Sequence, residues 1–167
     1  MPGRSLAIAL LIALCPAALH ACLCSNGGPR NALRRSSTVF LGRVISTTLR
    51  RQEPYGEVRL ARFKVTQAIK GTTTGKTEEI EYLVDTGGNC GLPLTAGLQL
   101  LVYATPDSGS VVPWTDYCAG TKLQECAEPD LRALRIPVPP GARDCSPPPV
   151  RGTGPSRSAH SRSRAAI

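Results

Sequence analysis

The cysteines that remain after an amino-terminal leader restrict the fold of this chain more than any other feature. The leader, residues 1–21, has a basic Arg4, the apolar run LAIALLIAL and the small-residue stretch AALHA. This is the layout of a secretory signal peptide, and it is too short to remain as a membrane-spanning helix. We predict cleavage between Ala21 and Cys22, with cleavage after Ala18 as the alternative.

Cleavage leaves six of the seven cysteines in the exported chain, because Cys15 belongs to the leader. An even number of cysteines in an exported chain predicts disulfide bonds and a secreted, extracellular location, with a periplasmic location as the alternative. Spacing alone leaves every pairing open. Structural zinc sites usually draw on Cys-x-x-Cys pairs, so we expect no metal of its own and no cofactor. The six cysteines are Cys22, Cys24, Cys90, Cys118, Cys126 and Cys145.

The composition divides the exported chain into one domain and a tail. Residues 22–135 are long enough for one hydrophobic core. Residues 136–167 are rich in Pro, Ser and Arg with almost nothing to bury, so we predict a disordered tail. The tail has five arginines against Asp144, which is half of the net charge of +8. Such a tail is able to contact anionic surfaces or polymers, but a solvated end is the favoured interpretation.

Five apolar or alternating segments predict strands, and helical segments flank them. A helix is expected within 29–37, where Pro29 suits a first helical turn, and another within 121–135, interrupted at Pro129. The pattern favours a mainly β chain: a small antiparallel, five-stranded Greek-key (OB-like) barrel with short flanking helices, stapled by disulfides. The strands are expected at 38–48 with a bend at Gly42, 56–71 with a bulge, 76–85, 98–104, and 110–118 with Pro113 at an edge or kink.

The residues that most enzymes use are missing from the predicted domain. The two histidines, His20 and His160, fall in the leader and the tail, so no imidazole is present for nucleophilic catalysis or zinc ligation. No HExxH, GxSxG, P-loop or GxGxxG motif occurs. The acidic side chains within 78–85, Glu81 among them, are interpreted as a solvated strand face. Aromatic residues make up 4%, which disfavours base stacking. We therefore expect neither an enzyme nor a nucleic-acid-binding protein.

The start of the exported chain and several later motifs resemble the N-terminal, netrin-like domain of the tissue inhibitors of metalloproteinases. The mature chain begins Cys-Leu-Cys, and a short helix and the strand VFLGRV follow. Further agreement comes from FKVTQAIKG, from NCG at 89–91 and from TDYC at the end of the fifth strand. The separations of 68 positions between 22 and 90, and of 94 between 24 and 118, are similar to those of the family's first two disulfides. The resemblance covers about residues 22–120.

The resemblance implies the disulfides Cys22–Cys90 and Cys24–Cys118, which leaves Cys126 and Cys145 to pair. Each of the first two closes a loop that stabilises the fold by roughly 4 kcal/mol in the chain-entropy model. Two departures from the family stand out. PRNALRRSS lacks the cysteine that the family has in its first helical region, and the Pro/Arg tail replaces a second cysteine-rich subdomain. The chain thus looks like a one-domain relative.

The resemblance also implies a function, that of a secreted, monomeric inhibitor whose partner is a zinc metalloendopeptidase. A protease zinc keeps one position open for a water molecule. In the implied mechanism the α-amine and carbonyl oxygen of Cys22 chelate that zinc, which the target supplies. Leu23 enters the adjacent specificity pocket, where its burial is worth roughly 1.5–3 kcal/mol, and the segment 54–56 lies nearby. Flanking contacts are implied for Ser25, Asn89, Gly91 and Leu92.

Two other interpretations remain open. In the first, Cys22 and Cys24 are structural bridges in an OB-like binding module without inhibitory activity. In the second, LHAC is a lipoprotein cleavage box and Cys22 is acylated, which would anchor the chain to a membrane. Acylation would leave Cys90 unpaired and make the cysteine count odd. A membrane partner is expected only in this case.

Overall fold

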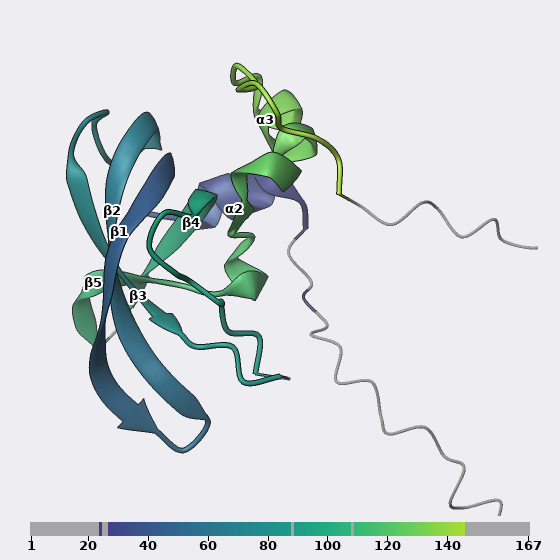
Figure 1. Ribbon diagram of the computed structural model, residues 1–167. Helices are drawn as coiled ribbons and strands as arrows, with labels where there is room; N and C mark the ends of the chain where they lie inside the picture. The colour runs from purple at the N-terminus through teal and green to yellow at the C-terminus, as the bar shows by residue number, and fades with distance from the viewer. Residues whose placement is uncertain (1–23, 25–26, 88, 108, 146–167) are drawn as a thin grey trace, which may run out of the picture.

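The computed structural model describes residues 24, 27–87, 89–107 and 109–145 (Figure 1). Strands dominate this part of the chain, and helix α2 begins with Pro29 in its first turn, as the sequence predicts. In chain order the elements are α2 (Pro29–Arg35), β1 (Thr38–Glu53), β2 (Gly56–Lys70), β3 (Thr77–Leu83), β4 (Gln99–Asp107), β5 (Ser110–Thr115), the 3-10 turn η1 (Tyr117–Ala119), β6 (Lys122–Leu123), the 3-10 turn η2 (Gln124–Cys126) and α3 (Glu128–Leu134).

Five of the strands form a closed ring in the order β1-β2-β3-β5-β4, because β4 pairs back onto β1. Four of the neighbouring pairs are antiparallel, whereas β3 and β5 run parallel, with Glu81 opposite Trp114 and Tyr82 opposite Thr115. The expectation of an antiparallel barrel is therefore wrong at this pair. Strand directions cannot alternate all the way round a ring with an odd number of strands, so one pair has to be parallel. The short β6 pairs with β4.

One hydrophobic core fills the ring. At its centre the rings of Phe40 and Phe63 pack edge to face, with 5.5 Å between their centroids. Leu92 and Leu94, from the segment between β3 and β4, also enter this core. Its other members come from the strands, and the full set is Phe40, Val44, Ala61, Phe63, Val65, Ile80, Tyr82, Leu92, Leu94, Leu100, Val102 and Ala104.

A second core lies between the ring and the two helices. Successive residues of a strand point to opposite faces. Alternate residues of β1 and β4 therefore face the core inside the ring, and the residues between them face the second core. This explains why LQLLVYA is apolar throughout: both faces of β4 are covered. Helices α2 and α3 lie together on one side of the ring (Figure 1). The second core consists of Ala32, Val39, Leu41, Leu101, Tyr103, Ala127 and Leu131.

Strands β1 and β2 form a long hairpin along one side of the molecule (Figure 1). β1 continues to Glu53, beyond the predicted end at residue 48, because residues 48–53 pair with the start of β2. The pairing shifts register at four places, one of them between Leu41 and Gly42, where the bend is predicted. From the sequence we expect one bulge, on β2. The additional shifts increase the coiling that a long two-stranded ribbon needs to join a small ring.

Glu81 corrects the interpretation of the acidic run as a solvated face. Glu81 is only 2% exposed, because arginines of the β1–β2 hairpin cover it. Arg51 Nη1 lies 2.8 Å from Glu81 Oε2, and Arg50 Nε lies 3.5 Å from Oε1. The hydrogen bond to Glu81 raises the pKa of Arg51 above its ordinary value. A buried carboxylate needs such partners, and the pair ties the hairpin to β3.

Residues 136–145 continue past α3 and lie against the domain. Cys145 forms a disulfide with Cys126, and the Arg143 N–H donates to the Glu125 carbonyl oxygen at 2.6 Å. Ile136 packs on the second core. Disulfides such as this one indicate an oxidising environment. In the part of the chain that the structure describes, no helix has the length and hydrophobicity needed to cross a bilayer. Residues 146–167 of the predicted tail lie outside the described residues.

Candidate functional site

A disulfide fixes the amino-terminal segment to the end of the ring where β5 stops. Cys24 is bonded to Cys118, with 5.1 Å between the two Cα atoms, in the pairing that the family resemblance implies. Cys118 lies in turn η1, which Asp116 caps by accepting a hydrogen bond from the Ala119 N–H at 2.6 Å. The position of Cys24 therefore depends on a turn that directly follows a strand of the ring.

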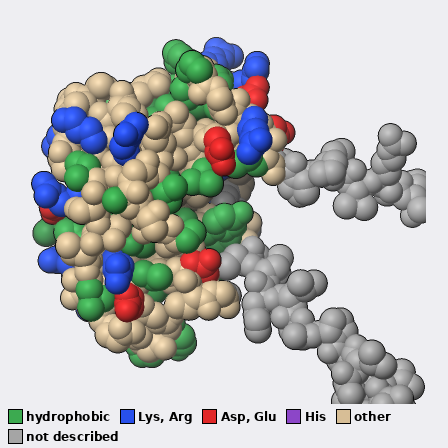
Figure 2. Space-filling view, in the orientation of Figure 1, with side chains coloured by type: hydrophobic (Ala, Val, Ile, Leu, Met, Phe, Trp, Pro, Cys, Tyr) green, Lys and Arg blue, Asp and Glu red, His purple; other side chains and the backbone are tan. Residues whose placement is uncertain are grey.

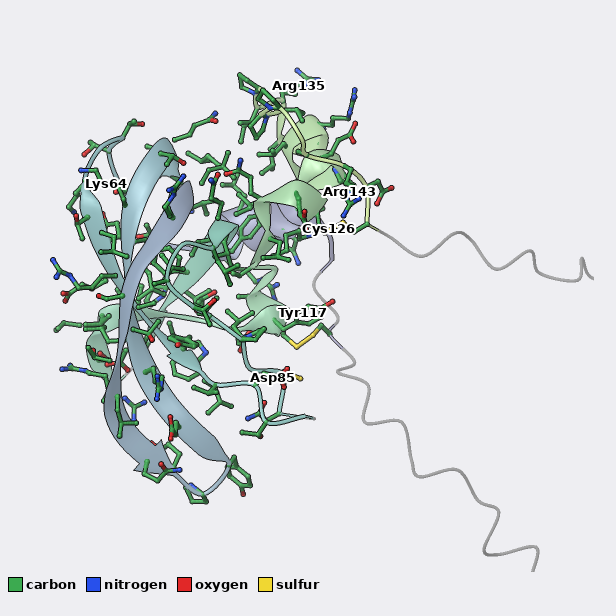
Figure 3. All side chains as sticks on the ribbon, in the orientation of Figure 1. Lys64, Asp85, Tyr117, Cys126, Arg135 and Arg143 are labelled. Atoms are coloured by element: carbon green, nitrogen blue, oxygen red, sulfur yellow. A yellow bond between two sulfur atoms is a disulfide. The ribbon has the colours of Figure 1, made fainter. Side chains whose placement is uncertain are left out.

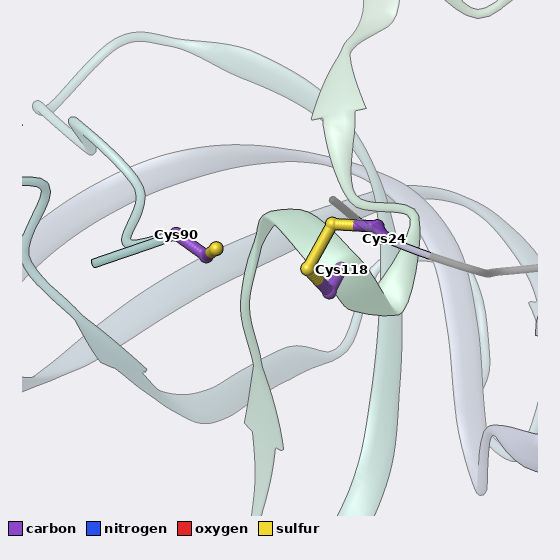
Figure 4. A group of neighbouring side chains, drawn as sticks. All are labelled: Cys24, Cys90 and Cys118. Carbon is purple, nitrogen blue, oxygen red and sulfur yellow. A yellow bond between two sulfur atoms is a disulfide. The ribbon is translucent and has the colours of Figure 1, made fainter. Parts of the chain in front are cut away.

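Cys90 lies beside this disulfide, so three cysteines form one group, here termed the cysteine cluster: Cys24, Cys90 and Cys118 (Figure 4). Their sulfur atoms lie within 4.8 Å of one another. Such a group could hold a metal ion as thiolates, but Cys24 and Cys118 are bonded to each other and Cys90 is also disulfide-bonded. Because metal binding needs deprotonated thiols, the disulfides account for the cluster better than a metal does.

Cys90 is held in a specific backbone conformation. Its φ of 57° is in the left-handed region, which costs a non-glycine residue roughly 1–2 kcal/mol. The Cys90 carbonyl oxygen accepts a hydrogen bond from the Tyr117 N–H at 3.0 Å. This bond joins the loop around Cys90 to turn η1, next to the Cys24–Cys118 disulfide. Two loops and the amino-terminal segment therefore converge at the cysteine cluster.

Asn89 links this loop to the tip of the β1–β2 hairpin. Its Nδ2 donates to the carbonyl oxygens of Tyr55 at 3.1 Å and Val84 at 2.8 Å. Its Oδ1 accepts from the N–H groups of Thr86 at 3.3 Å and Gly91 at 3.0 Å. All four contacts are to backbone, so the side chain sets the shape of the loop. Segment 54–56 therefore lies next to Asn89, whereas its expected position beside Cys22 and Leu23 stays a prediction.

Gly91 and Leu92, for which flanking contacts are predicted, each have a structural role. A Cβ on Gly91 would lie 2.5 Å from the backbone C and O atoms of Val84, so no larger residue fits. Leu92 is 4% exposed and belongs to the core inside the ring. Its N–H donates to Leu83 O at 2.8 Å. The segment passes close to the end of β3 before it enters the ring, so a flanking contact at these two positions would use the backbone.

Two exposed tyrosines lie on the segments that meet near the cysteine cluster, and neither was predicted as a site residue. Tyr55, at the hairpin tip, is 80% exposed, and Tyr117, in turn η1, is 56% exposed. Figure 3 shows Tyr117 beside the disulfide, with Asp85 on the other side of it. Exposed aromatic side chains at loop tips are common in binding surfaces. The sequence could have indicated exposure of Tyr55, because it lies between Pro54 and Gly56 in a turn. Tyr117 lies in the segment predicted as the fifth strand, which gives no such indication.

Three predicted site residues, Cys22, Leu23 and Ser25, lie outside the described residues. The Cys22–Cys90 bridge therefore stays a prediction, although Cys90 is disulfide-bonded. The structure does describe the residues that would hold this segment, namely Cys24, two residues after Cys22, and the loops around Cys24.

Comparisons with known proteins add no relative. No family model matches the chain, and neither a curated protein nor a solved structure matches it.

Proposed function

We propose that this protein is a secreted inhibitor of zinc metalloendopeptidases that uses its own amino terminus as the zinc ligand. In this proposal signal cleavage exposes Cys22, and its α-amine and carbonyl oxygen chelate the zinc of the target protease. Leu23 occupies the adjacent specificity pocket. The protein itself carries out no reaction and needs no cofactor, because the target supplies the metal.

The observation that carries this proposal is the convergence at the cysteine cluster. A terminal amine binds a metal more tightly when its position is already restricted, since each flexible residue that becomes ordered on binding lowers the affinity. Cys24 is held by the disulfide to Cys118, and Cys90 lies beside it. Residue 22 is two positions from the first of these anchors, so its reach is short.

The proposed chemistry follows from the amine. An α-amine has a pKa near 8 in water, so it loses its proton readily when a metal binds. Amine and carbonyl of one residue form a five-membered chelate that displaces the zinc-bound water, and the protease then lacks its nucleophile. In this proposal the loop at Asn89 and the hairpin tip at Tyr55, which are hydrogen-bonded to each other, contact the protease around its cleft.

We further propose that the ring is an OB-like Greek key. The strand order supports this, since β1, β2 and β3 are consecutive neighbours and β4 returns to lie beside β1. This is the spatial order 4-1-2-3 that defines the motif. Folds of this type serve many unrelated binding functions, so the fold does not by itself choose between inhibitor and binding module.

The deciding experiment compares the mature protein, beginning at Cys22, with a form that carries one additional Ala before Cys22. Both are assayed against a panel of zinc endopeptidases, and a form with one additional Ala at the carboxyl terminus is the matched control. We expect nearly complete loss of inhibition on amino-terminal extension and none in the control. Mass spectrometry of the exported protein must show a free Cys22 amine.

The alternative is a binding module, secreted or lipid-anchored, without inhibitory activity. The exposed Tyr55 and Leu49 of the hairpin favour a binding surface of some kind. Such a module would be indifferent to the additional Ala. A lipid-anchored form would show acyl mass on Cys22 and would partition with membranes.

A further inference from the structure

Three sulfur atoms lie close together in the cysteine cluster, and two of them are bonded to each other. Cys24 and Cys118 form a disulfide, and Cys90 belongs to a separate disulfide. The Sγ atom of Cys90 nevertheless lies within 4.8 Å of the Sγ atoms of both Cys24 and Cys118. Thiol–disulfide exchange proceeds by attack of a thiolate on a sulfur atom of the disulfide, so it first requires that the attacking sulfur be near the bonded pair. Cys90 meets this requirement.

The position of Cys90 does not depend on its own disulfide alone. The Cys90 carbonyl oxygen accepts a hydrogen bond from the Tyr117 N–H at 3.0 Å, and Tyr117 directly precedes Cys118. Asn89 holds the same loop through its four hydrogen bonds to backbone groups. These hydrogen bonds do not involve sulfur. They therefore keep Cys90 beside Cys118 after the disulfide of Cys90 is opened.

The cysteine cluster is accessible to small molecules in solution. Cys24, Cys90 and Cys118 are each half-buried rather than enclosed. Figure 3 shows Tyr117 beside the disulfide, and on this side of the molecule Figure 2 shows hydrophobic side chains, a class that includes Cys and Tyr, at the surface. A low-molecular-weight thiol is therefore able to reach the cluster while the domain stays folded.

The other described disulfide differs in its surroundings. Cys126 and Cys145 are bonded to each other, and Cys145 is exposed. Among the described residues, the cysteine cluster is the one group in which three sulfur atoms meet. The Cys126–Cys145 bond is thus open to reductant but has no third sulfur beside it, which makes it an internal control for exchange.

We propose that the cysteine cluster is a site of intramolecular thiol–disulfide exchange that releases the amino-terminal segment. A low-molecular-weight thiol of the glutathione class first reduces the disulfide of Cys90. Two molecules of this thiol are oxidised to one disulfide, and Cys90 and its partner each become a thiol. The Cys90 thiolate, having lost its proton to water, then attacks Cys118 Sγ. The Cys90–Cys118 bond forms, the Cys24–Cys118 bond breaks, and the electron pair leaves on Cys24 Sγ, which takes up a proton.

Attack at Cys118 is favoured over attack at Cys24 by the hydrogen bond between Tyr117 and Cys90. A Cys90–Cys118 disulfide would connect two loops that this bond already holds together. Turn η1, which contains Cys118, is also fixed by its cap, because Asp116 accepts a hydrogen bond from the Ala119 N–H. Once its bond to Cys118 breaks, Cys24 has no covalent link to the ring other than the chain itself.

The exchange concerns the covalent state of three cysteines, so it does not depend on whether the protein inhibits a protease. Its regulatory consequence does rest on the proposed function: loss of the anchor at Cys24 frees the amino terminus, and inhibition falls as the Cys24 thiol appears. The two proposals fail separately. Exchange without any initial inhibition would contradict the proposed function alone, and inhibition without exchange would contradict this inference alone.

The test is a pulse of reductant followed by a chase without it. The mature, full-length protein is treated briefly with glutathione, the reductant is removed in acid, and the sample is returned to neutral pH without oxygen. Thiols are trapped with N-ethylmaleimide, and non-reduced peptides are mapped by mass spectrometry. By the end of the chase we expect labelled Cys24 and linked Cys90–Cys118 peptides, formed at a rate independent of protein concentration. The Cys126–Cys145 bond should not change during the chase.

Cys90→Ser removes the attacking sulfur. Any thiol left unpaired by this substitution is blocked with N-ethylmaleimide before the pulse. Reductant should then open Cys24–Cys118 about tenfold or more slowly than in the unchanged protein, because an intramolecular attack is replaced by a bimolecular one. The matched control is Cys126→Ser with Cys145→Ser, which also removes one disulfide and should leave the exchange unchanged. Thermal unfolding checks the fold of each variant, and the chase in the unchanged protein decides the question if Cys90→Ser does not fold.

Three results would overturn the proposal. The first is a Cys24–Cys118 bond that persists through the chase in molecules whose Cys90 is reduced. The second is a product in which Cys24 is linked to Cys90, which would keep the amino-terminal segment anchored. The third is equally fast opening of Cys24–Cys118 in Cys90→Ser, which would show direct attack by the reductant.

Discussion

Asn89 Nδ2 lies 3.1 Å from the carbonyl oxygen of Tyr55, and this hydrogen bond joins two segments that are 34 residues apart in the sequence. The same side chain makes three further bonds to the backbone around Cys90. One amide group therefore holds the hairpin tip and the loop of the cysteine cluster in a single arrangement.

Asn89→Ala should lower the free energy of unfolding by about 2–3 kcal/mol, because several backbone groups lose their partner at once. Denaturant unfolding measures the change. Asn89→Asp is the informative companion, since it keeps an acceptor for Thr86 and Gly91 but loses the donor for Tyr55. In Asn89→Asp we expect faster amide exchange at residues 55–56. Unchanged exchange there would contradict the role given to this bond.

Gly91→Ala should destabilise the protein by more than about 2 kcal/mol, because the new Cβ would lie 2.5 Å from the Val84 backbone. The relevant measurement is the midpoint of thermal or denaturant unfolding. Gly109→Ala is the matched control: it adds the same atom where nothing lies within 4 Å of it. The control should change stability by no more than about 0.5 kcal/mol. Similar effects at the two positions would refute the steric argument.

Tyr103→Phe should leave stability at neutral pH unchanged or increase it. Tyr103 is fully buried, and its hydroxyl has no hydrogen-bond partner among the described residues. Replacing a polar group that is buried without a partner removes a desolvation cost.

The same substitution should also change the pH dependence of stability. Burial, with a smaller contribution from the charge of Asp130, raises the pKa of Tyr103 above its ordinary value of 10.0. Above about pH 10 the unfolded chain loses this proton while the folded chain keeps it, so stability falls as pH rises, by about 1.4 kcal/mol per pH unit. Unfolding measured from pH 8 to 11 should show a shallower decline in Tyr103→Phe. Burial also raises the pKa of Tyr82, so part of the decline remains.

The two described disulfides should differ in their effects. Replacing Cys24 and Cys118 together by Ser opens a connection between residues 94 positions apart, which costs about 4–5 kcal/mol in the chain-entropy model. Replacing Cys126 and Cys145 opens one of 19 positions and costs about 3 kcal/mol. Only the replacement of Cys24 and Cys118 should abolish inhibition of a zinc endopeptidase. Equal inhibition by both variants would argue against the role of the cysteine cluster.

Local features of the fold were predictable because they depend on neighbouring residues in the sequence. Strand segments followed from alternating or continuous apolar residues, and Pro29 marked the first turn of α2. The helical segment near Pro129 was also predicted, although this proline lies in the first turn of α3 rather than interrupting it. The pairing of Cys24 with Cys118 came from a family resemblance, because spacing alone left every pairing open.

The candidate site was predictable only in outline. Asn89 and the segment 54–56 were expected near the amino terminus, but the four bonds of Asn89 were not, since an asparagine in a polar loop has no sequence signal for its partners. For Leu92 the family resemblance implied a flanking contact, and nothing in the local sequence indicated burial. It is buried because the chain enters the ring at that point.

By itself the sequence determined that the chain is mainly β, where its strands and helices lie, and that its described cysteines can pair, because these properties follow from local periodicity and composition. The tertiary structure decided the parallel contact of β3 with β5 and the burial of Glu81 under Arg50 and Arg51. Each of these depends on which segments become neighbours when the ring closes. That choice is made by packing between residues far apart in the chain.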